Sequence, residues 1–264
     1  MSSGTFRARP SDGIAFVSGA SSGIGRACVI ELAQRGYSVA ATARRADDLK
    51  ALAATLPAQI FAYPGDVRDT AGTKALIAEI EKDQGPIALA FLNAGLSLHA
   101  EREGFDAALL AQTYAVNVQG TANCLDPLLA AMAQRHRGQI AINASLAGYN
   151  GLPSSPIYGS SKAALIYMAE ALALMYGNAG IRIQVVNHGF VRTAMTDQEK
   201  DFAQPYKIEP AAAAKIICDG FERGGFEIAF PWQLAALSKF IRVLPYAAKF
   251  KVMDYAVNRA KKLE

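Results

Sequence analysis

The sequence predicts an α/β fold in which a doubly wound, parallel, seven-stranded sheet is flanked by helices and followed by a C-terminal helical extension. Short β-rich runs alternate along the chain with longer segments whose apolar residues recur at helical spacing, the pattern of a parallel sheet. The short runs are mostly apolar, as expected of strands that helices cover on both faces. The 264 residues, 52% hydrophobic and 19% charged, indicate one domain with a large core.

Strands are expected where the apolar runs occur. They are Ile14–Ser18, Ser38–Ala43, Gln59–Tyr63, Ile87–Leu92, Gln139–Ala144, Arg182–His188 and Glu227–Phe230. Helices are expected between them, and Gly36 and Gly177 stand where two of these helices would end. They are Ile24–Arg35, Asp47–Leu56, Thr70–Asp83, a pair within Phe105–Arg135, and Ser154–Tyr176.

Three segments lie outside this alternation. Residues 1–12 form an N-terminal arm ahead of the first strand. From Val191 to Arg223 the pattern is irregular, so we expect residues 191–225 to form a substrate loop. Residues 231–264 predict two helices that are separated at Pro245.

Composition excludes several classes of protein. No apolar run is long enough to span a bilayer and the first residues do not resemble a secretory signal, so we expect a cytoplasmic protein. Cys28, Cys124 and Cys218 lie far apart in sequence, which predicts small core residues and neither a disulfide framework nor a metal site.

The net charge of +4 is unevenly distributed. From residue 231 onwards seven basic residues stand against two acidic ones, a formal charge of +5, so the first 230 residues carry −1. The basic character therefore belongs to the C-terminal extension, and a nucleic-acid-binding surface over the body of the protein is not expected.

A glycine-rich turn follows the first strand and leads directly into an apolar-periodic helix. Glycines let the backbone approach a pyrophosphate, which then lies at the N–H groups of the helix N-terminus, and the third glycine allows the helix to pack closely. A tight turn between a strand and a helix also recruits glycine for structural reasons alone. As a dinucleotide site, the turn would bind the cofactor through Gly19, Ser21, Ser22, Gly23, Ile24 and Gly25.

The spacing of these glycines, G-x-x-x-G-x-G, resembles the short-chain dehydrogenase/reductase family. Further residues of the family pattern follow in order: Asp66–Val67, Asn93–Gly95, Asn117, Ser145, and Tyr158 with Lys162 four positions later. The resemblance covers roughly residues 12 to 230 and implies a Rossmann-like fold and an oxidoreductase. It also implies that Asp66 and Val67 hold the adenine and that Asn93, Ala94 and Gly95 line the adenine-ribose side.

The end of the second strand indicates which nicotinamide cofactor binds. NAD-preferring enzymes place there an acidic residue that takes the ribose 2′-hydroxyl. Here Arg44 and Arg45 occupy this place, and two guanidinium groups suit a 2′-phosphate, which predicts NADP(H) rather than NAD(H). The alternative is that both arginines only begin a solvated loop.

Four residues are predicted to carry the chemistry. Tyr158 and Lys162 project from one helix face, where the ammonium lowers the phenol pKa from its usual value of about 10 and so allows proton exchange. Ser145 would hydrogen-bond the same substrate oxygen. By resemblance, Asn117 holds a water that connects Lys162 to solvent, and Val191 and Thr193 face the nicotinamide carboxamide. One departure is His188, which stands where the family usually has proline.

The residues that follow the catalytic positions are mostly apolar, which predicts a lipophilic or uncharged carbonyl substrate, although each can equally be a core residue. The predicted substrate-binding residues are Ser145, Leu146, Tyr149, Tyr158, Phe190 and Met195, with Leu96, Leu152, Pro153 and Ile157 as further candidates for the cleft.

The C-terminal extension is amphipathic and basic, with Leu234, Leu237, Ile241 and Leu244 on one predicted face. Such a segment fits three roles: it covers the substrate mouth, packs on a partner subunit, or rests as a peripheral contact on an anionic membrane. Packing or a lid is favoured, because amphipathic helices most often cover their own protein's core. The resemblance also implies a homodimer or homotetramer, commonly formed through the helices that carry Asn117 and Tyr158.

Together these observations predict an NADP(H)-dependent oxidoreductase that interconverts a carbonyl compound and a secondary alcohol, with Tyr158 as general acid and base. One alternative is a non-catalytic NADP(H)-binding sensor or scaffold, which would not need Ser145, Tyr158 and Lys162. The other is a peripheral membrane protein whose main function lies in its C-terminal helices.

Overall fold

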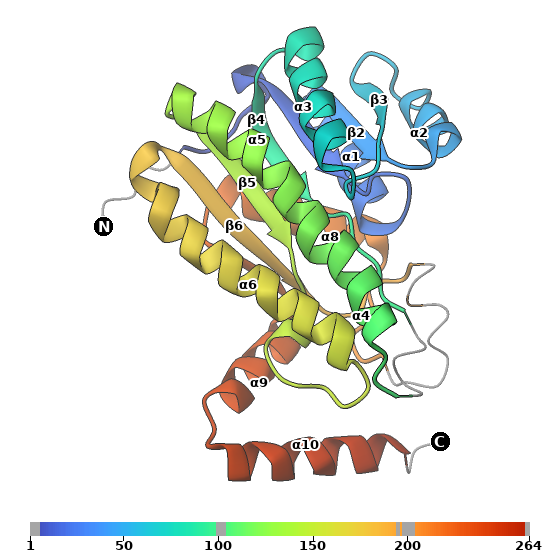
Figure 1. Cartoon of the computed structure of the whole chain (residues 1–264), viewed down its shortest axis with the longest axis vertical. Coiled ribbons are helices and arrows are strands. Elements are labelled where there is room, and N and C mark those ends of the chain that lie inside the picture. The colour runs from blue at the N-terminus through green and yellow to red at the C-terminus, as the bar shows by residue number, and fades with distance from the viewer. Residues whose placement is uncertain (1–5, 99–103, 194–195, 197–203, 262–264) are drawn as a thin grey trace.

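The computed structural model describes residues 6–98, 104–193, 196 and 204–261. Within this part of the chain one parallel sheet has the strand order β3-β2-β1-β4-β5-β6-β7 (Figure 1), which confirms the predicted doubly wound architecture. Its strands are β1 (Ile14–Ser18), β2 (Val39–Ala43), β3 (Ile60–Pro64), β4 (Ile87–Leu92), β5 (Gly138–Asn143), β6 (Ile181–His188) and β7 (Glu227–Phe230).

The strand order reverses between β1 and β4, and this switch point positions the functional site. β1 pairs on one side with β2 and on the other with β4, in a register that sets Ser18 beside both Thr42 and Leu92. The loops that leave β1 and β4 must therefore part to opposite faces of the sheet. A crevice opens at the carboxyl ends of the strands at such a point, and ligands of doubly wound sheets bind there.

Helices cover both faces of the sheet. α1 and α8 pack against each other on one face, whereas α3, α5 and α6 cover the other, where α5 and α6 run side by side (Figure 1). The predicted pair within Phe105–Arg135 is α4 and α5, joined through a π-helical turn at Ala115–Gln119. The helices are α1 (Gly23–Gln34), α2 (Ala46–Ala53), α3 (Thr70–Gln84), α4 (Ala107–Tyr114), α5 (Gly120–Arg135), α6 (Pro156–Tyr176), α8 (Pro210–Arg223), α9 (Trp232–Arg242) and α10 (Tyr246–Lys261).

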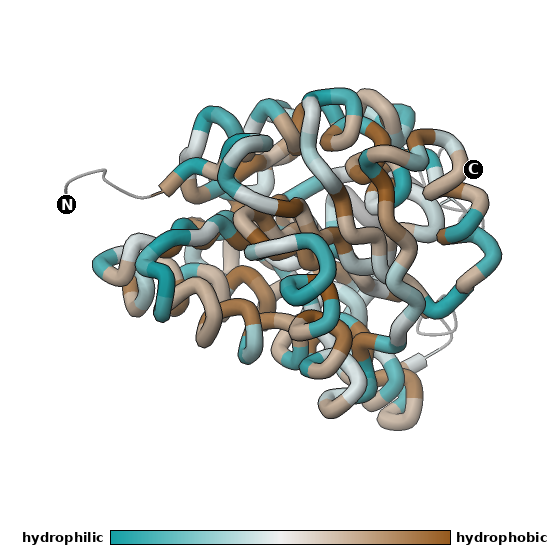
Figure 2. The backbone as a smooth tube through the Cα atoms, turned by 90° about the horizontal axis from the view of Figure 1, so that it is seen from above, coloured by the Kyte–Doolittle hydropathy of each residue, from teal (hydrophilic) through white to brown (hydrophobic). Residues whose placement is uncertain are grey.

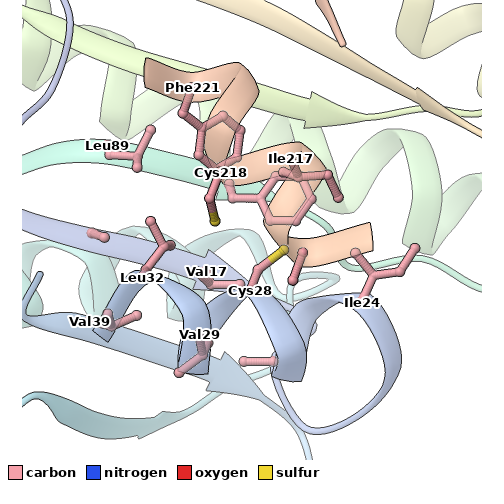
Figure 3. Packing of buried hydrophobic residues seen from close by; sticks show 14 of the residues in the cluster. Val17, Ile24, Cys28, Val29, Leu32, Val39, Leu89, Ile217, Cys218 and Phe221 are labelled. Carbon is pink, nitrogen blue, oxygen red and sulfur yellow. The ribbon is translucent and has the colours of Figure 1, made fainter. Parts of the chain in front are cut away.

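Two apolar cores lie between the sheet and its helical layers, and Figure 2 shows hydrophobic segments in the interior of the chain's path. In the first core, α1 and α8 bring Cys28 and Cys218 face to face (Figure 3). Both are buried free thiols, as predicted, and burial raises the pKa of Cys28 well above its usual value. The sequence did not indicate that these two residues meet, since 190 positions separate them.

The prediction of a loop over residues 191–225 is wrong in its second half, because α8 occupies Pro210–Arg223. Pro210 is the first residue of this helix, a position where proline loses no hydrogen bond, so it starts the helix and does not break it. The first turns are built from alanine, which weakens the apolar pattern, yet Ala213, Ile217 and Phe221 are all buried against the sheet and α1. Tertiary packing thus stabilises a helix that the apolar pattern did not reveal.

The C-terminal extension forms two helices, α9 and α10, as predicted, and Pro245 lies between them. α9 is anchored to the body through Ala235 and Ile241, which are buried, and through a hydrogen bond from Asn150 Nδ2 to the Ser238 carbonyl oxygen at 2.9 Å. α10 lies at the far end of the molecule (Figure 1). In the described part of the chain no helix has the length and apolar character needed to span a membrane.

Candidate active site

A single cavity of about 650 Å³ connects the loop after β1 with the C-terminal helices. Its walls come from the carboxyl ends of the strands around the switch point and from α6, α9 and α10. Most of the residues that the sequence assigned to a cofactor or substrate line this cavity. Those among the described residues are Gly19, Ser21, Ser22, Gly23, Ile24, Arg44, Arg45, Asp66, Val67, Asn93, Ala94, Gly95, Leu96, Ser145, Leu146, Leu152, Tyr158, Lys162, Phe190, Val191 and Thr193.

The glycine loop has the shape that a dinucleotide requires. Gly19 has φ +69°, and a Cβ there would lie 2.8 Å from the Ala94 Cα, so only glycine fits. Gly23 has φ +55° and opens α1, and a Cβ there would lie 3.0 Å from Thr193 Cγ2. Backbone N–H groups at the start of α1 thus border the cavity beside two glycines that leave room for a close backbone approach, the arrangement that binds a pyrophosphate. The residues present therefore fit a dinucleotide.

Gly25 has a different role from the other two glycines. A Cβ on Gly25 would lie 2.3 Å from the Gly19 carbonyl oxygen, so this residue lies beneath the loop and is not part of the cavity wall. Its assignment as a direct cofactor contact is corrected to a packing role that brings α1 against the loop. The predicted reason for this glycine, close packing of the helix, is confirmed.

Asn93 ties the ends of three strands together. Its Nδ2 donates to the carbonyl oxygens of Ser18 and Gly19, both at 3.2 Å, while its Oδ1 accepts from Asn143 Nδ2 at 2.9 Å. The Ser18 hydroxyl in turn accepts from the Asn93 backbone N–H at 3.0 Å. These bonds hold the glycine loop in register with β4 and β5, a structural task beside the predicted ribose contact.

The two arginines after β2 differ in their surroundings. Both are exposed and both line the cavity. Arg45 is paired with Asp48 on the first turn of α2. Arg44 forms no ion pair among the described residues. The hydrogen bond to Arg68 lowers the pKa of Asp66, and the charge of Arg44 lowers it further. Arg44 is therefore the cation available to a ligand at this end.

Ser145, Tyr158 and Lys162 come together at the opposite end of the cavity. Lys162 is only 3% exposed, its Nζ donates to the Asn143 carbonyl oxygen at 2.7 Å, and it lies 5.5 Å from the centroid of the Tyr158 ring. Ser145 is the last residue before a short 3-10 turn, and its Oγ donates to the His188 carbonyl oxygen at 3.3 Å. This arrangement offers a hydroxyl, a phenol and a buried ammonium to one bound molecule.

Burial lowers the pKa of Lys162 from its usual 10.5 to about 8. Between pH 8 and 10.5 this lysine is mostly protonated in the unfolded chain and mostly neutral in the folded one, so the free energy of unfolding should rise as the pH rises through that window. Below pH 8 the buried lysine is charged, and the whole cost of burying that charge destabilises the fold. Lys162→Met should therefore raise the free energy of unfolding at pH 7 by about 1–3 kcal/mol while turnover is lost.

Urea unfolding at pH 7 and pH 10 tests this expectation, with Lys74→Met as the matched control, because Lys74 is an exposed lysine on α3. The control should change stability by less than about 0.5 kcal/mol at both values. A Lys162→Met protein that is less stable than wild type at pH 7 would contradict the expectation.

Asn117 does not line the cavity but is buried behind it in the π-helical turn. Its Oδ1 accepts from the Leu96 N–H at 2.8 Å, and its Nδ2 donates to the Leu96 carbonyl oxygen and the Ser161 Oγ, both at 3.0 Å. A Cβ on Gly95 would lie 3.3 Å from Asn117 Oδ1 and 3.5 Å from Lys162 Nζ. Asn117 thus fixes the segment next to Lys162, and the water proposed by resemblance stays a prediction.

Comparison with known proteins identifies the family. The sequence profile described as short chain dehydrogenase matches residues 13–204, most of the chain. The chain belongs to the short-chain dehydrogenase/reductase family. An uncharacterized oxidoreductase of Myxococcus xanthus is 32% identical over 234 residues, which cover 88% of this chain and 92% of that protein.

Two solved structures share the fold. A short-chain dehydrogenase/reductase of Burkholderia phymatum in complex with NAD has a TM-score of 0.78 and 23% identity, covering 86% of this chain and 92% of the other. A short-chain dehydrogenase of Sphingobium yanoikuyae in complex with NADPH has a TM-score of 0.76 and 23% identity, covering 95% of each chain. This chain is accordingly an oxidoreductase of the family, acting on alcohols or carbonyls with a nicotinamide cofactor.

In this short-chain dehydrogenase/reductase, His188 takes the place of the usual family proline and borders the cavity. Its ring Nδ1 lies 2.8 Å from the Gly189 carbonyl oxygen, which assigns the proton to Nδ1. Burial lowers the pKa of His188 to about 4, so the ring is neutral at physiological pH. The bonds from Gly189 N–H to the Phe230 oxygen, 2.8 Å, and from Ser145 to His188 hold the turn where proline would stiffen it.

Some substrate assignments need correction. Tyr149 is 6% exposed and does not line the cavity, because its hydroxyl bonds to Glu227 and receives a hydrogen bond from Asn187 at 3.0 Å. Ile157 is buried in the core, and Pro153 is not part of the wall. Met195 lies outside the described residues.

The sequence predicted that the C-terminal extension could cover the substrate mouth, but the predicted substrate residues included none from these helices. α9 places Leu234, Leu237, Ser238 and Ile241 on the wall, and α10 adds Met253. The amphipathic pattern of α9 was visible in the sequence, and the favoured interpretation of a lid or of packing fits this position. The pattern did not by itself indicate that the extension folds back over the cavity.

Proposed function

We propose that this enzyme is an NADP(H)-dependent oxidoreductase that interconverts an uncharged, lipophilic carbonyl compound and its secondary alcohol. One observation carries the proposal: Ser145, Tyr158 and Lys162 share a single cavity with the glycine loop and the Arg44 cation. The two ends of this cavity divide the work between cofactor recognition and proton transfer.

The preference for NADP(H) is supported by the residues around the adenosine end. A 2′-phosphate carries charge that Arg44 can meet with charge-assisted hydrogen bonds, and Arg45 stands next to it on the rim. β2 ends at Ala43, so no carboxylate stands at the position where a ribose 2′-hydroxyl is usually bound. Asp66 lies farther along the wall and is paired with Arg68.

The residues of the chain handle the proton and the substrate oxygen, while the bound nicotinamide supplies or accepts the hydride. In reduction, Tyr158 donates its phenolic proton to the carbonyl oxygen, and the Lys162 ammonium stabilises the resulting phenolate. The Ser145 hydroxyl redirects its long hydrogen bond from the His188 oxygen to the same substrate oxygen, which orients the carbonyl. In oxidation the phenolate takes the proton back.

The substrate end of the cavity favours an uncharged molecule. Among the described lining residues the charged ones are Arg44, Arg45 and Asp66 at the adenosine end and Lys162 at the catalytic centre. His188 is neutral, so no described residue at the substrate end could pair with a carboxylate or phosphate. The rest of that wall is largely apolar and includes Leu146, Leu152, Phe190, Leu234, Leu237, Ile241 and Met253.

We further propose that the protein forms a homodimer or homotetramer through the layer that contains α5 and α6. α6 leaves Tyr167, Leu174 and Met175 exposed, an apolar surface that a second copy would cover. Light scattering on the purified chain tests this, and a monomer at micromolar concentration would contradict it.

The function is tested by fluorescence titration of the protein with NADPH and NADH, followed by NADPH oxidation with a panel of lipophilic ketones and aldehydes. We expect tighter binding of NADPH and turnover of neutral, apolar carbonyl compounds in preference to keto acids. Preference for NADH would refute the assignment of Arg44. Binding of NADPH without turnover of any panel member would favour the sensor alternative.

A further inference from the structure

The outer surface of the C-terminal helices carries an unusual share of exposed apolar side chains. Fourteen large hydrophobic side chains are exposed among the described residues, and eight of them lie between residues 232 and 255. These eight are Trp232, Leu237, Phe240, Val243, Tyr246, Phe250, Val252 and Tyr255, and we call them the apolar rim. Large exposed apolar side chains gathered on one pair of helices are typical of an interaction site.

Basic side chains are interleaved with the apolar rim. Between residues 232 and 255 they are Lys239, Arg242, Lys249 and Lys251, against a single acidic residue, Asp254. Lys239 is paired with Glu227, whereas no carboxylate partner is found for the other three among the described residues. Arg242 lies over the Tyr149 ring, 5.8 Å from its centroid. The segment therefore presents aromatic rings together with cations that have no carboxylate partner among the described residues, which is the composition of a helix that lies in the interface of an anionic bilayer.

The placement of α10 agrees with that use. Its described side chains are exposed or half-buried with none fully buried, and within the described part of the chain it packs mainly on α9 (Figure 1). Tyr246 and Phe250 stack with their ring centroids 5.7 Å apart, and both remain mostly exposed. The helix thus has aromatic side chains that the described residues leave largely exposed.

We propose that α9 and α10 dock this enzyme on the surface of an anionic phospholipid bilayer as a peripheral contact. A second copy of the chain is a poorer occupant, because a symmetric interface would bring two basic surfaces together. Leu237 of the apolar rim also lines the cavity, as do Ile241 and Met253 on the same two helices, so docking would bring the substrate end of the cavity next to lipid. The inference does not depend on the cofactor preference proposed above.

Flotation of the full chain with vesicles tests the docking. We expect binding to vesicles of 30% phosphatidylglycerol in phosphatidylcholine, weak binding to phosphatidylcholine alone, and release at high salt, because screening weakens the attraction of exposed charges. If the protein floated with neither kind of vesicle at low salt, the proposal would be overturned.

Two pairs of matched variants locate the contact. Phe250→Ser should lower the partition coefficient about tenfold, whereas Phe105→Ser, which changes a similarly exposed phenylalanine before α4, should leave it unchanged. Lys251→Glu should lower the partition coefficient about five- to tenfold, whereas Lys74→Glu on α3, with the same change of net charge, should have a much smaller effect.

Neither Phe250 nor Lys251 lines the cavity, so both variants should keep the thermal unfolding temperature and the lipid-free NADPH oxidation of the wild type. If the Phe250 and Lys251 variants bound vesicles as strongly as their control variants, the assignment of α9 and α10 as the docking surface would be refuted. A dimer that Phe250→Ser dissociates in the absence of lipid would show that the rim joins two copies, and this result would also overturn the proposal.

Discussion

Tyr158→Phe is expected to reduce the kcat of carbonyl reduction by about 10²- to 10⁴-fold, the usual contribution of a positioned general acid. The substitution removes the phenolic proton and leaves the ring that Lys162 faces at 5.5 Å. NADPH affinity should change less than about threefold, because the glycine loop and Arg44 are untouched. Steady-state kinetics with a turned-over ketone and fluorescence titration of NADPH measure the two quantities.

The control for this experiment is Tyr149→Phe. Tyr149 is a nearby tyrosine whose hydroxyl bonds to Glu227 and Asn187 and does not line the cavity. Its loss should lower stability by about 1 kcal/mol and leave kcat within a fewfold of wild type. Equal losses of kcat in the two variants would mean that the phenol of Tyr158 is not the proton donor.

Arg44→Ala is expected to raise the Kd for NADPH about 10- to 100-fold and to leave the Kd for NADH almost unchanged. An exposed guanidinium that meets a phosphate makes charge-assisted hydrogen bonds, which are stronger than neutral ones, and a bare hydroxyl offers no charge to meet. The effect should shrink as ionic strength rises, because Arg44 is exposed to solvent.

Arg45→Ala is the matched control, since Arg45 borders the same cavity but already pairs with Asp48. Its removal should raise the Kd for NADPH only about two- to fivefold. If Arg45→Ala had the larger effect, the ion pair with Asp48 would have to open on binding. If neither substitution discriminated NADPH from NADH, the NADP(H) assignment would be wrong.

Local patterns in the sequence were sufficient to predict the strands of the sheet and the glycine loop. β1, β4 and β7 have the predicted bounds, because a buried parallel strand is a short apolar run that ends abruptly at a turn. The glycine loop could be predicted because a backbone with positive φ beside a ligand site requires glycine, and Gly19 and Gly23 both have positive φ. Tyr158 and Lys162 share a helix face because they are four residues apart.

Other features depend on contacts between distant parts of the chain. α8 is stabilised by packing on α1, and its alanine-rich first turns carried no strong pattern of their own. Tyr149 follows the catalytic serine closely in sequence, yet Glu227, 78 positions later, draws its hydroxyl away from the cavity. Burial behind the Asn143 carbonyl oxygen lowers the pKa of Lys162 to about 8.

The sequence by itself determined the fold class, the loop that fits a dinucleotide and the residue types that exchange the proton, because each is encoded in the spacing of neighbouring residues. Only the tertiary structure decided which arginine is available to a ligand, which residues form the substrate wall, and that α9 and α10 present the apolar rim to the outside. The physical reason is that partners and burial arise from elements far apart in the chain, whose meeting no local pattern records.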